Sequence, residues 1–448
     1  MTDLQILKGC ELHVHTGGCL AADDLLMMGW EHYEAVNWTL FVDSYEAAYG
    51  KRIDPHRLYE EAIGGDEGLA RFRRHVIFNE EDGGDFGRFQ AKFNFLVCLT
   101  RYWRHELQQP EAFGRRVLQR HQDEGLDYVE YRAMYADLIE KPEGFFVFHR
   151  ENGRLMQKAC NDQFTARYLV SLPREAPLAG YELLQQFFDV HPDLIPVIVG
   201  IDFCAIEEGF PPDNVRELFK RLQADNAARP ERTLEVAYHV GESYFDKSLE
   251  SAVRWCHEVA ELGAQRLGHA IALGLDPMIA ISRRPQAHEV ELVSERLAQI
   301  AYDLAHREAL AAYGVRVDAM ALVQEEERLE RLKGDEVVKR PYTPQRLAEI
   351  RQRQTFVLDR LAELGTVIES CPTSNLRIGG VPASEQHPIH RFLDSDVNLV
   401  ISADDPGIFD SSLADEVEWV LRYTDYDAER LVARLGDPRR FRFGQKRP

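Results

Sequence analysis

The chain has 448 residues, of which 45% are hydrophobic and 10% aromatic, and its formal net charge is −22 at pH 7. This composition is that of a globular protein with a packed core, and it excludes general disorder. The negative charge argues against a nucleic acid or an anionic membrane surface as a partner, because either would be repelled. It favours a small, neutral or cationic molecule as the ligand.

The cysteines and the N-terminus indicate the cellular compartment. The seven cysteines are scattered without a Cys-x-x-Cys pair, which does not suit a disulfide framework. The first residues, "MTDLQILKGCELHVH", lack the basic start and apolar core of a signal peptide, and no apolar run of about 18 residues follows. We therefore expect reduced thiols, a cytoplasmic location and no membrane partner.

Short apolar segments alternate with long helical stretches along the chain, which is typical of a parallel βα architecture. One helical stretch, for example, has Ser248 as a candidate N-cap and Gly263 as a stop. The predicted fold class is α/β, a TIM (β/α)8 barrel that forms a single domain over residues 1–448. The eight predicted strand segments are 7–15, 126–135, 165–174, 195–204, 233–242, 265–273, 366–372 and 398–406.

Two connections are far longer than a βα unit requires. Residues 16–125 follow the first strand and include an amphipathic aromatic helix, and residues 276–365 follow the sixth strand. The second insertion contains a charged run at 323–340, and the stretch 343–365 has helix-capping signals at both ends. We expect both insertions to be mostly helical and to lie outside the barrel, as lids or as surfaces for a homo-oligomer.

The stretch "KGCELHVHTGGCL" carries two histidines one residue apart inside an apolar run. Because residues i and i+2 of a strand face the same side, His13 and His15 should point together. Two imidazoles on one face suit a divalent metal such as zinc, which needs one or two further ligands. A chance pair at a strand end is the alternative, so the prediction depends on ligands elsewhere in the chain.

Further candidate ligands and acids occur where other predicted strands end, which is where such barrels build their active sites. They are His239 and Glu242 of "HVGE", His269 of "LGHA", and Asp404 and Asp405 of "SADDP". Each alone has an ordinary alternative as a core histidine, a helix N-cap or a solvated carboxylate. Their joint occurrence at one rim favours a site, since three neutral histidines and one carboxylate make a zinc set with one position open for water.

This arrangement predicts metal-assisted hydrolysis. Water bound to zinc loses a proton near neutral pH and becomes a nucleophile. We expect Asp405 to orient it or to bind substrate, and His269 to hold or deprotonate it. Glu242 is the candidate that donates a proton to the electrophile.

The motifs "ELHVH", "HVGE", "RLGHA", "ESCPTSN" and "SADDP", in this order, resemble those of the adenosine deaminase family of the amidohydrolase superfamily, which has a zinc-containing (β/α)8 barrel. The resemblance implies that Glu242 protonates purine N1, that His269 lies beside the attacking hydroxide, and that Asp405 contacts the hydroxide and the purine. The implied activity is that of a hydrolase on C–N bonds of cyclic amidines, converting adenosine to inosine and ammonia. The resemblance also implies one zinc ion per chain, bound by His13, His15, His239 and Asp404.

The implied substrate-binding residues are Gly17, Ala205 and Asp405, and the first two depart from the family pattern. Gly17 stands where animal adenosine deaminases have the Asp that meets the ribose 5′ hydroxyl. Ala205 stands at the Gly whose backbone meets purine N3. A deaminase of adenine, AMP or a 5′-modified adenosine such as aminodeoxyfutalosine is therefore an alternative, and a barrel without catalysis that serves as a binding module is another. The complete ligand set together with Glu242 favours catalysis.

Overall fold

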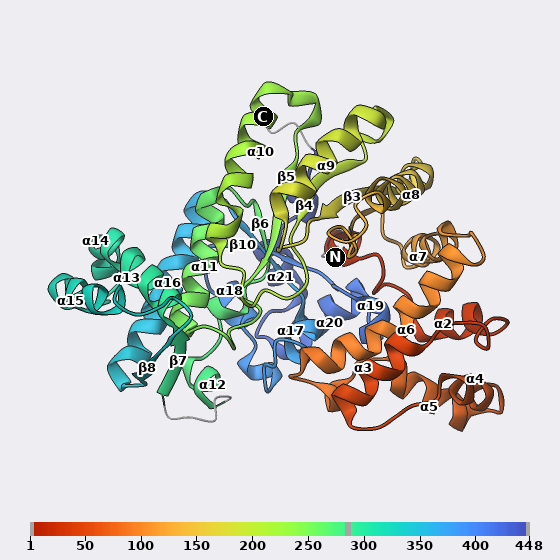
Figure 1. Ribbon diagram of the computed structural model, residues 1–448, viewed down its shortest axis with the longest axis horizontal. Helices are drawn as coiled ribbons and strands as arrows, with labels where there is room; N and C mark the ends of the chain where they lie inside the picture. Colours follow the sequence, from red (N-terminus) through yellow and green to blue (C-terminus); the bar gives the residue numbers. More distant parts are fainter. Residues whose placement is uncertain (1–3, 283–287, 445–448) are drawn as a thin grey trace.

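The computed structural model describes residues 4–282 and 288–444, and its centre is a parallel eight-stranded sheet (Figure 1). Each predicted strand segment contains one strand of this sheet, so the prediction of a TIM barrel is confirmed. In spatial order the strands are β1 (Cys10–His15), β2 (Tyr128–Met134), β3 (Thr165–Ser171), β4 (Ile198–Asp202), β5 (Glu235–Val240), β6 (Arg266–His269), β9 (Val367–Ser370) and β10 (Asn398–Ile401).

The barrel closes between β1 and the residues that follow β10. Val14 and Asp404 form a parallel bridge there. The Asp404 N–H donates to the His13 carbonyl at 2.9 Å, and the His15 N–H donates to the Asp404 carbonyl at 3.0 Å. Asp404 has a φ of 63°, a left-handed conformation that costs a non-glycine residue about 1–3 kcal/mol. The seam therefore joins the two ends of the chain's barrel through the backbone of candidate ligands.

Helices outside the sheet connect the strands (Figure 1). α11 begins after Ser248, whose hydroxyl accepts a hydrogen bond from the Ser251 N–H, and it ends at Gly263 with a φ of 118°, as the sequence predicted. None of the described helices is both long enough and apolar enough to cross a membrane. The helices that follow β2, β3, β4, β5 and β10 are α8 (Gly144–Ala159), α9 (Pro177–Val190), α10 (Arg216–Ala228), α11 (Leu249–Leu262) and α20 (Leu413–Tyr423).

The segment between β1 and β2 is helical and has an aromatic core of its own. The Phe95 ring centroid lies 4.7 Å from that of Trp38 and 5.1 Å from that of Phe41. Tyr59 and Phe72 contact the same ring. These rings fix α6 beside the start of the barrel. The helices of the segment are α2 (Ala22–Gly29), α3 (Thr39–Tyr49), α4 (Pro55–Ile63), α5 (Asp66–Val76), α6 (Phe86–His105) and α7 (Glu111–Asp123).

The segment between β6 and β9 lies on the opposite side of the barrel in Figure 1 and is mostly helical. It contains an antiparallel pair of strands, β7 and β8, that the sequence reading did not predict. Its last helix, α16, packs on α11 and belongs to the barrel wall. Residues 283–287 of the predicted insertion lie outside the described residues. The elements are α12 (Pro277–Ser282), β7 (His288–Leu292), α13 (Val293–Ala305), α14 (Arg307–Ala312), α15 (Ala319–Leu329), β8 (Val337–Pro341) and α16 (Pro344–Leu364).

A buried ionic layer crosses the barrel beneath the candidate site. The Arg132 guanidinium, with no exposed side-chain surface, lies 3.2 Å from Asp202 Oδ1 and 3.1 Å from Glu369 Oε2. Arg266 contacts the other oxygen of Glu369 at 2.9 Å and also pairs with Glu130. Burial raises the pKa of Glu369, but the two guanidinium groups outweigh it and hold the pKa below its ordinary value. Glu369 is therefore charged, and both guanidinium groups are paired with carboxylates.

We predict that Arg132→Met lowers the free energy of unfolding by about 3–5 kcal/mol, because it leaves Asp202 and Glu369 as buried carboxylates without this cation. Urea denaturation of the purified variant measures the change. Lys158→Met, which removes a 63% exposed lysine paired with Glu111, is the control and should change the value by no more than about 0.5 kcal/mol. An equally small loss in Arg132→Met would contradict the role assigned to the ionic layer.

Candidate metal centre

The structure brings the four predicted metal ligands together at the barrel seam. His15 Nε2 lies 3.2 Å from His239 Nε2 and 3.3 Å from Asp404 Oδ1. His13 Nε2 lies 3.6 Å from the same Asp404 oxygen, and the His13 and His239 ring centroids are 4.6 Å apart. A tetrahedral ion with bonds of about 2.0–2.2 Å holds its ligands about 3.3 Å apart. The spacing of these donor atoms therefore fits a metal ion.

Two of the imidazoles are oriented by buried carboxylates. His13 Nδ1 lies 2.7 Å from Glu369 Oε2, and His239 Nδ1 lies 3.0 Å from Asp202 Oδ1. When a carboxylate accepts a hydrogen bond from Nδ1–H, the proton stays on Nδ1, and the Nε2 lone pair is available to a metal. In the described part of the chain, the buried His13 Nε2 atom has no hydrogen-bond partner, as expected of an atom that ligates.

The charge states also suit a metal ion, because imidazole ligands must be neutral. Burial lowers the pKa of His239 to about 4 and brings the pKa of His15 well below its ordinary value. Burial raises the pKa of Asp404, but the contact with His13 and the other imidazoles outweighs it and brings that pKa well below the ordinary value. At neutral pH the cluster therefore offers two neutral imidazoles, those of His15 and His239, and one carboxylate. Burial and Arg132 lower the pKa of His13, but Glu369 and Asp404 outweigh them and raise it to about 9, so a metal ion that binds there must displace a proton from His13.

The predicted acids lie beside this cluster. Glu242 Oε2 is 3.7 Å from His269 Nε2, which is 3.9 Å from Asp404 Oδ2. Burial raises the pKa of Glu242. Burial, followed by the Asp404 charge, raises the pKa of Asp405 well above its ordinary value. The geometry thus places two carboxyl groups with raised pKa values next to a charged ligand cluster.

Two residues that the sequence did not single out, Asn375 and Glu207, support these side chains. His269 Nδ1 lies 3.0 Å from Asn375 Oδ1, so Nδ1–H donates a hydrogen bond to the amide oxygen. The other ring nitrogen, Nε2, points to Glu242. The Glu207 carboxylate accepts hydrogen bonds from the backbone N–H groups of Gly241 and Glu242, both at 3.1 Å. These bonds fix the turn that carries Glu242. Ser243 N–H donates to the same carboxylate at 3.2 Å.

Two glycines allow the close packing of the cluster. A Cβ atom at Gly18 would lie 1.6 Å from Asp405 Oδ1, and one at Gly268 would lie 2.9 Å from His13 Cε1. The predicted substrate-binding residue Gly17 lies against α6, where its Cβ would be 3.2 Å from Phe93 Cζ. Ala205 is exposed and has a φ of 64°. Gly17 and Ala205 thus stand near the loops of the site without a side-chain contact to the ligands.

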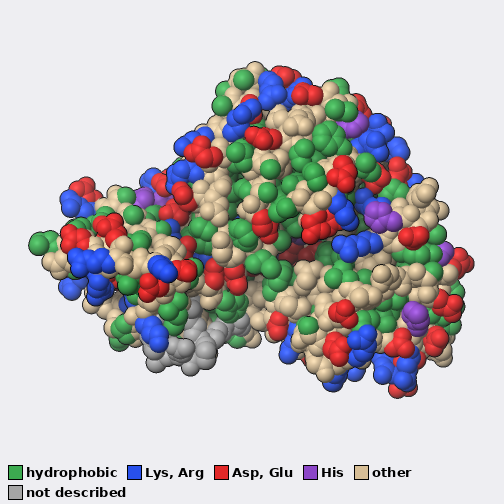
Figure 2. Space-filling view, in the orientation of Figure 1, with side chains coloured by type: hydrophobic (Ala, Val, Ile, Leu, Met, Phe, Trp, Pro, Cys, Tyr) green, Lys and Arg blue, Asp and Glu red, His purple; other side chains and the backbone are tan. Residues whose placement is uncertain are grey.

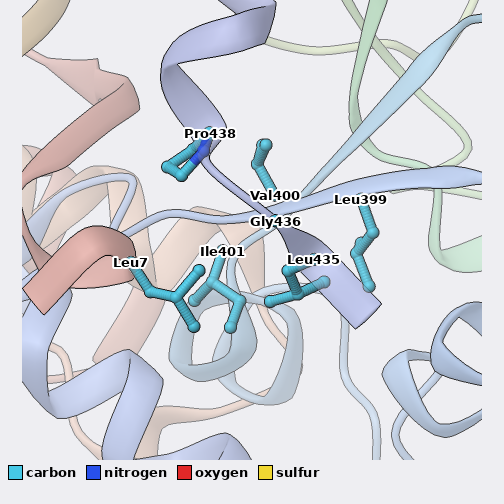
Figure 3. Close-up of a pocket in the computed structure, with 7 residues that line it drawn as sticks. All are labelled: Leu7, Leu399, Val400, Ile401, Leu435, Gly436 and Pro438. Carbon is cyan, nitrogen blue, oxygen red and sulfur yellow. The ribbon is translucent and has the colours of Figure 1, made fainter. Parts of the chain in front are cut away.

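The molecule has a hollowed face and, elsewhere, a small cavity. Figure 2 shows a face that is hollowed near its centre, where acidic side chains gather. A separate cavity of about 10 Å³ beside β10 and α21 (Ala428–Leu435) is shown in Figure 3. It has room for about one water molecule at most, and its lining is apolar, so it is a packing gap. It is lined by Leu7, Leu399, Val400, Ile401, Leu435, Gly436 and Pro438.

Residues 350–436 match the family model described as adenosine deaminase. Adenine deaminase of Rhizobium leguminosarum bv. trifolii (strain WSM2304) is 47% identical over 62 residues, which cover 14% of this chain and 19% of the relative. Adenine deaminase of Agrobacterium fabrum (strain C58 / ATCC 33970) is 43% identical over 102 residues, covering 18% of this chain and 31% of the relative. The matched segments thus span only about a fifth to a third of these relatives.

Solved structures match over nearly the whole chain. The adenine deaminase from Arthrobacter aurescens has a TM-score of 0.55 at 15% identity, covering 98% of this chain and 94% of that one. The N6-methyl-AMP deaminase from Arabidopsis thaliana has a TM-score of 0.53 at 14% identity, covering 99% and 94%. An amidohydrolase with bound zinc from "Burkhoderia ambifaria" has a TM-score of 0.55 at 13% identity, covering 99% and 87%. At these identities the matches support the fold.

We predict that Asp202→Asn weakens the binding of zinc to the cluster about 10–100-fold, because His239 Nδ1 loses its anionic acceptor. Equilibrium dialysis of metal-free protein against zinc and a competing chelator measures the affinity. Asp193→Asn, an exposed carboxylate outside the site, is the control. Unchanged zinc affinity in Asp202→Asn would show that the carboxylate does not tune the ligand.

Proposed function

We propose that this chain, which belongs to the adenosine deaminase family, is a metal-dependent aminohydrolase that deaminates the adenine ring of a small purine. The observation that carries the proposal is the position of Glu242, 3.7 Å from His269 and beside the convergent donors of His13, His15, His239 and Asp404. This arrangement puts a candidate proton donor and a candidate proton acceptor next to the candidate metal ligands, and hydrolysis at an amidine carbon needs both.

The donor set fits zinc, with three imidazole nitrogens and one carboxylate oxygen. His13, His15, His239 and Asp404 would hold one zinc ion per chain at this centre. A divalent ion supplies a Lewis acid there and lowers the pKa of water. The buried carboxylates of Glu369 and Asp202 would keep the His13 and His239 rings turned toward the ion.

The chain's own side chains would move the protons. Glu242, whose pKa is raised by burial, gives a proton to purine N1 and so neutralises the charge that develops on the ring as water attacks C6. His269, fixed by Asn375, accepts the proton that the attacking water loses. Asp405, which packs against Gly18, would hold the substrate in place. The amino group leaves as ammonia, so an adenine ring and water become a hypoxanthine ring and ammonia.

The substrate we place first is free adenine. The two curated relatives named above are adenine deaminases. Gly17 offers no carboxylate to a ribose 5′ hydroxyl, and a Cβ atom there would lie 3.2 Å from Phe93 Cζ, so any side chain at this position needs Phe93 to shift. Adenosine, the substrate that the sequence resemblance placed first, remains the main alternative, together with AMP, N6-methyl-AMP and 5′-modified adenosines such as aminodeoxyfutalosine.

A cytoplasmic location and self-association through the inserted helices also remain proposals.

A spectrophotometric screen of the zinc-loaded protein separates these substrates. We expect turnover of adenine, with a higher kcat/KM than for adenosine, AMP, N6-methyl-AMP or a 5′-modified adenosine. A higher kcat/KM for any of the others would replace adenine as the substrate and keep the reaction. Purine binding without ammonia release from any of them would instead favour the non-catalytic binding module.

We predict that Glu242→Gln lowers kcat by at least about two orders of magnitude, because the amide keeps the shape of the acid without its proton, and general acid help is worth about 10²–10⁴-fold. KM should change much less, and bound zinc and the unfolding midpoint should not change. Steady-state kinetics and elemental analysis measure both. Glu217→Gln, at a 74% exposed side chain, is the control. A near wild-type kcat in Glu242→Gln would show that another group protonates the ring.

We predict that chelation abolishes the activity and that zinc restores it. His239→Asn should lose one zinc ion per chain and the activity together, since the other donors then form an incomplete set. Elemental analysis of the dialysed proteins is the measurement. Full activity after complete removal of zinc would contradict the proposed role of the cluster.

A further inference from the structure

A second group of metal-binding side chains lies where the barrel helix α11 meets the inserted helix α13. His257 and Glu261 are four residues apart on α11, so they lie on one face of the helix. His306 directly follows α13. The Glu261 carboxylate oxygen Oε1 is 3.5 Å from His257 Nε2 and 3.9 Å from His306 Nε2. One donor atom from each of the three residues lies within 4.8 Å of the other two.

Both imidazoles of this group are held by Tyr302. The His306 Nδ1–H donates to the Tyr302 carbonyl at 2.9 Å, which leaves the His306 Nε2 lone pair free. His257 Nδ1 lies 2.7 Å from the Tyr302 hydroxyl. The two rings are thus turned so that their Nε2 atoms face Glu261, and this outer support is the kind that fixes a metal-binding histidine.

The inner nitrogen of this group has no partner. The His257 side chain is fully buried, and within residues 4–282 and 288–444 its Nε2 atom has no hydrogen bond. The distances of 3.5 and 3.9 Å to Glu261 exceed the 2.7–3.2 Å of an N–H···O hydrogen bond. A buried nitrogen that faces a carboxylate without a hydrogen bond suits an ion that binds both groups, because leaving the nitrogen unpaired costs free energy.

We propose that His257, Glu261 and His306 form a second zinc site, separate from the cluster at the barrel seam. Two imidazoles and a carboxylate are donors that zinc accepts. Tetrahedral ligands lie about 3.3 Å apart, so the Glu261 to His257 distance already fits and a small rotation of His306 completes the set. Glu261 is 41% and His306 25% exposed, so the remaining position faces solvent.

The position of this site indicates a structural role. α11 starts after the carboxyl end of β5, near Glu242, and runs back along the barrel, so its last turn lies at the end of the helix remote from the reacting groups. His306 belongs to the segment inserted between β6 and β9. A zinc ion would therefore tie the inserted helices to the barrel wall. This inference does not depend on the proposed deaminase activity.

Zinc titration of the chelator-stripped full chain tests the site. By equilibrium dialysis against zinc chloride we expect two zinc ions per chain in the wild type. The Glu261→Gln and His306→Gln variants should each keep one tightly bound zinc ion, at the barrel seam. Their affinity for the second zinc ion should be about tenfold weaker or more. Both residues are partly exposed, so these variants should fold. Glu308→Gln, at an 89% exposed neighbouring glutamate, should still bind two.

A thermal-unfolding readout isolates this site from the first. In the His239→Asn background, zinc should still raise the melting temperature, and the added Glu261→Gln change should remove that increase. One zinc per chain in the wild type, or two bound with unchanged affinity in both Glu261→Gln and His306→Gln, would overturn the proposal. Loss of turnover with two bound ions would instead count against the deaminase function alone.

Discussion

The structure depends on one buried cation, the guanidinium of Arg132, which lies inside the barrel between two carboxylates. The same oxygens that contact Arg132, Asp202 Oδ1 and Glu369 Oε2, also contact an imidazole, that of His239 and that of His13 respectively. The carboxylates are charged in a dry interior because Arg132 compensates them, and they can orient the histidines because they are charged. Barrel stability and ligand geometry therefore rest on the same group, and neither can be altered alone.

The carboxylates that face the barrel interior could not be assigned from the sequence. The same-face rule predicted that His13 and His15 point together, since it needs only local strand geometry. Glu369 and Asp202 lie on predicted strands, but a charge within an apolar strand has no partner until the neighbouring strands are placed. The roles of Asn375 and Glu207 could not be assigned from the sequence either, because their contacts join residues more than thirty positions apart.

The fold was predicted well where periodicity is long and poorly where it is short. The eight barrel strands alternate with helices whose apolar spacing is regular, so their order alone indicated the barrel. The pair β7 and β8 consists of five-residue strands within a charged stretch, and every position of β8 is exposed or half-buried, so its sequence has no alternation of buried apolar residues. The His257 group was also invisible in the sequence, since His306 reaches α11 only through tertiary packing.

The seam of the barrel has a dynamic consequence. The amides of His15 and Asp404 are bonded across the gap between β1 and β10, on the same residues whose side chains converge as donors. Those two amide protons exchange with solvent only when the seam separates, and separation pulls the donors apart. The hydrogen-exchange rate of these amides thus reports how often the barrel opens at the seam. An ion that bridges the donor side chains lowers this exchange rate as the fraction of ion-bound protein rises.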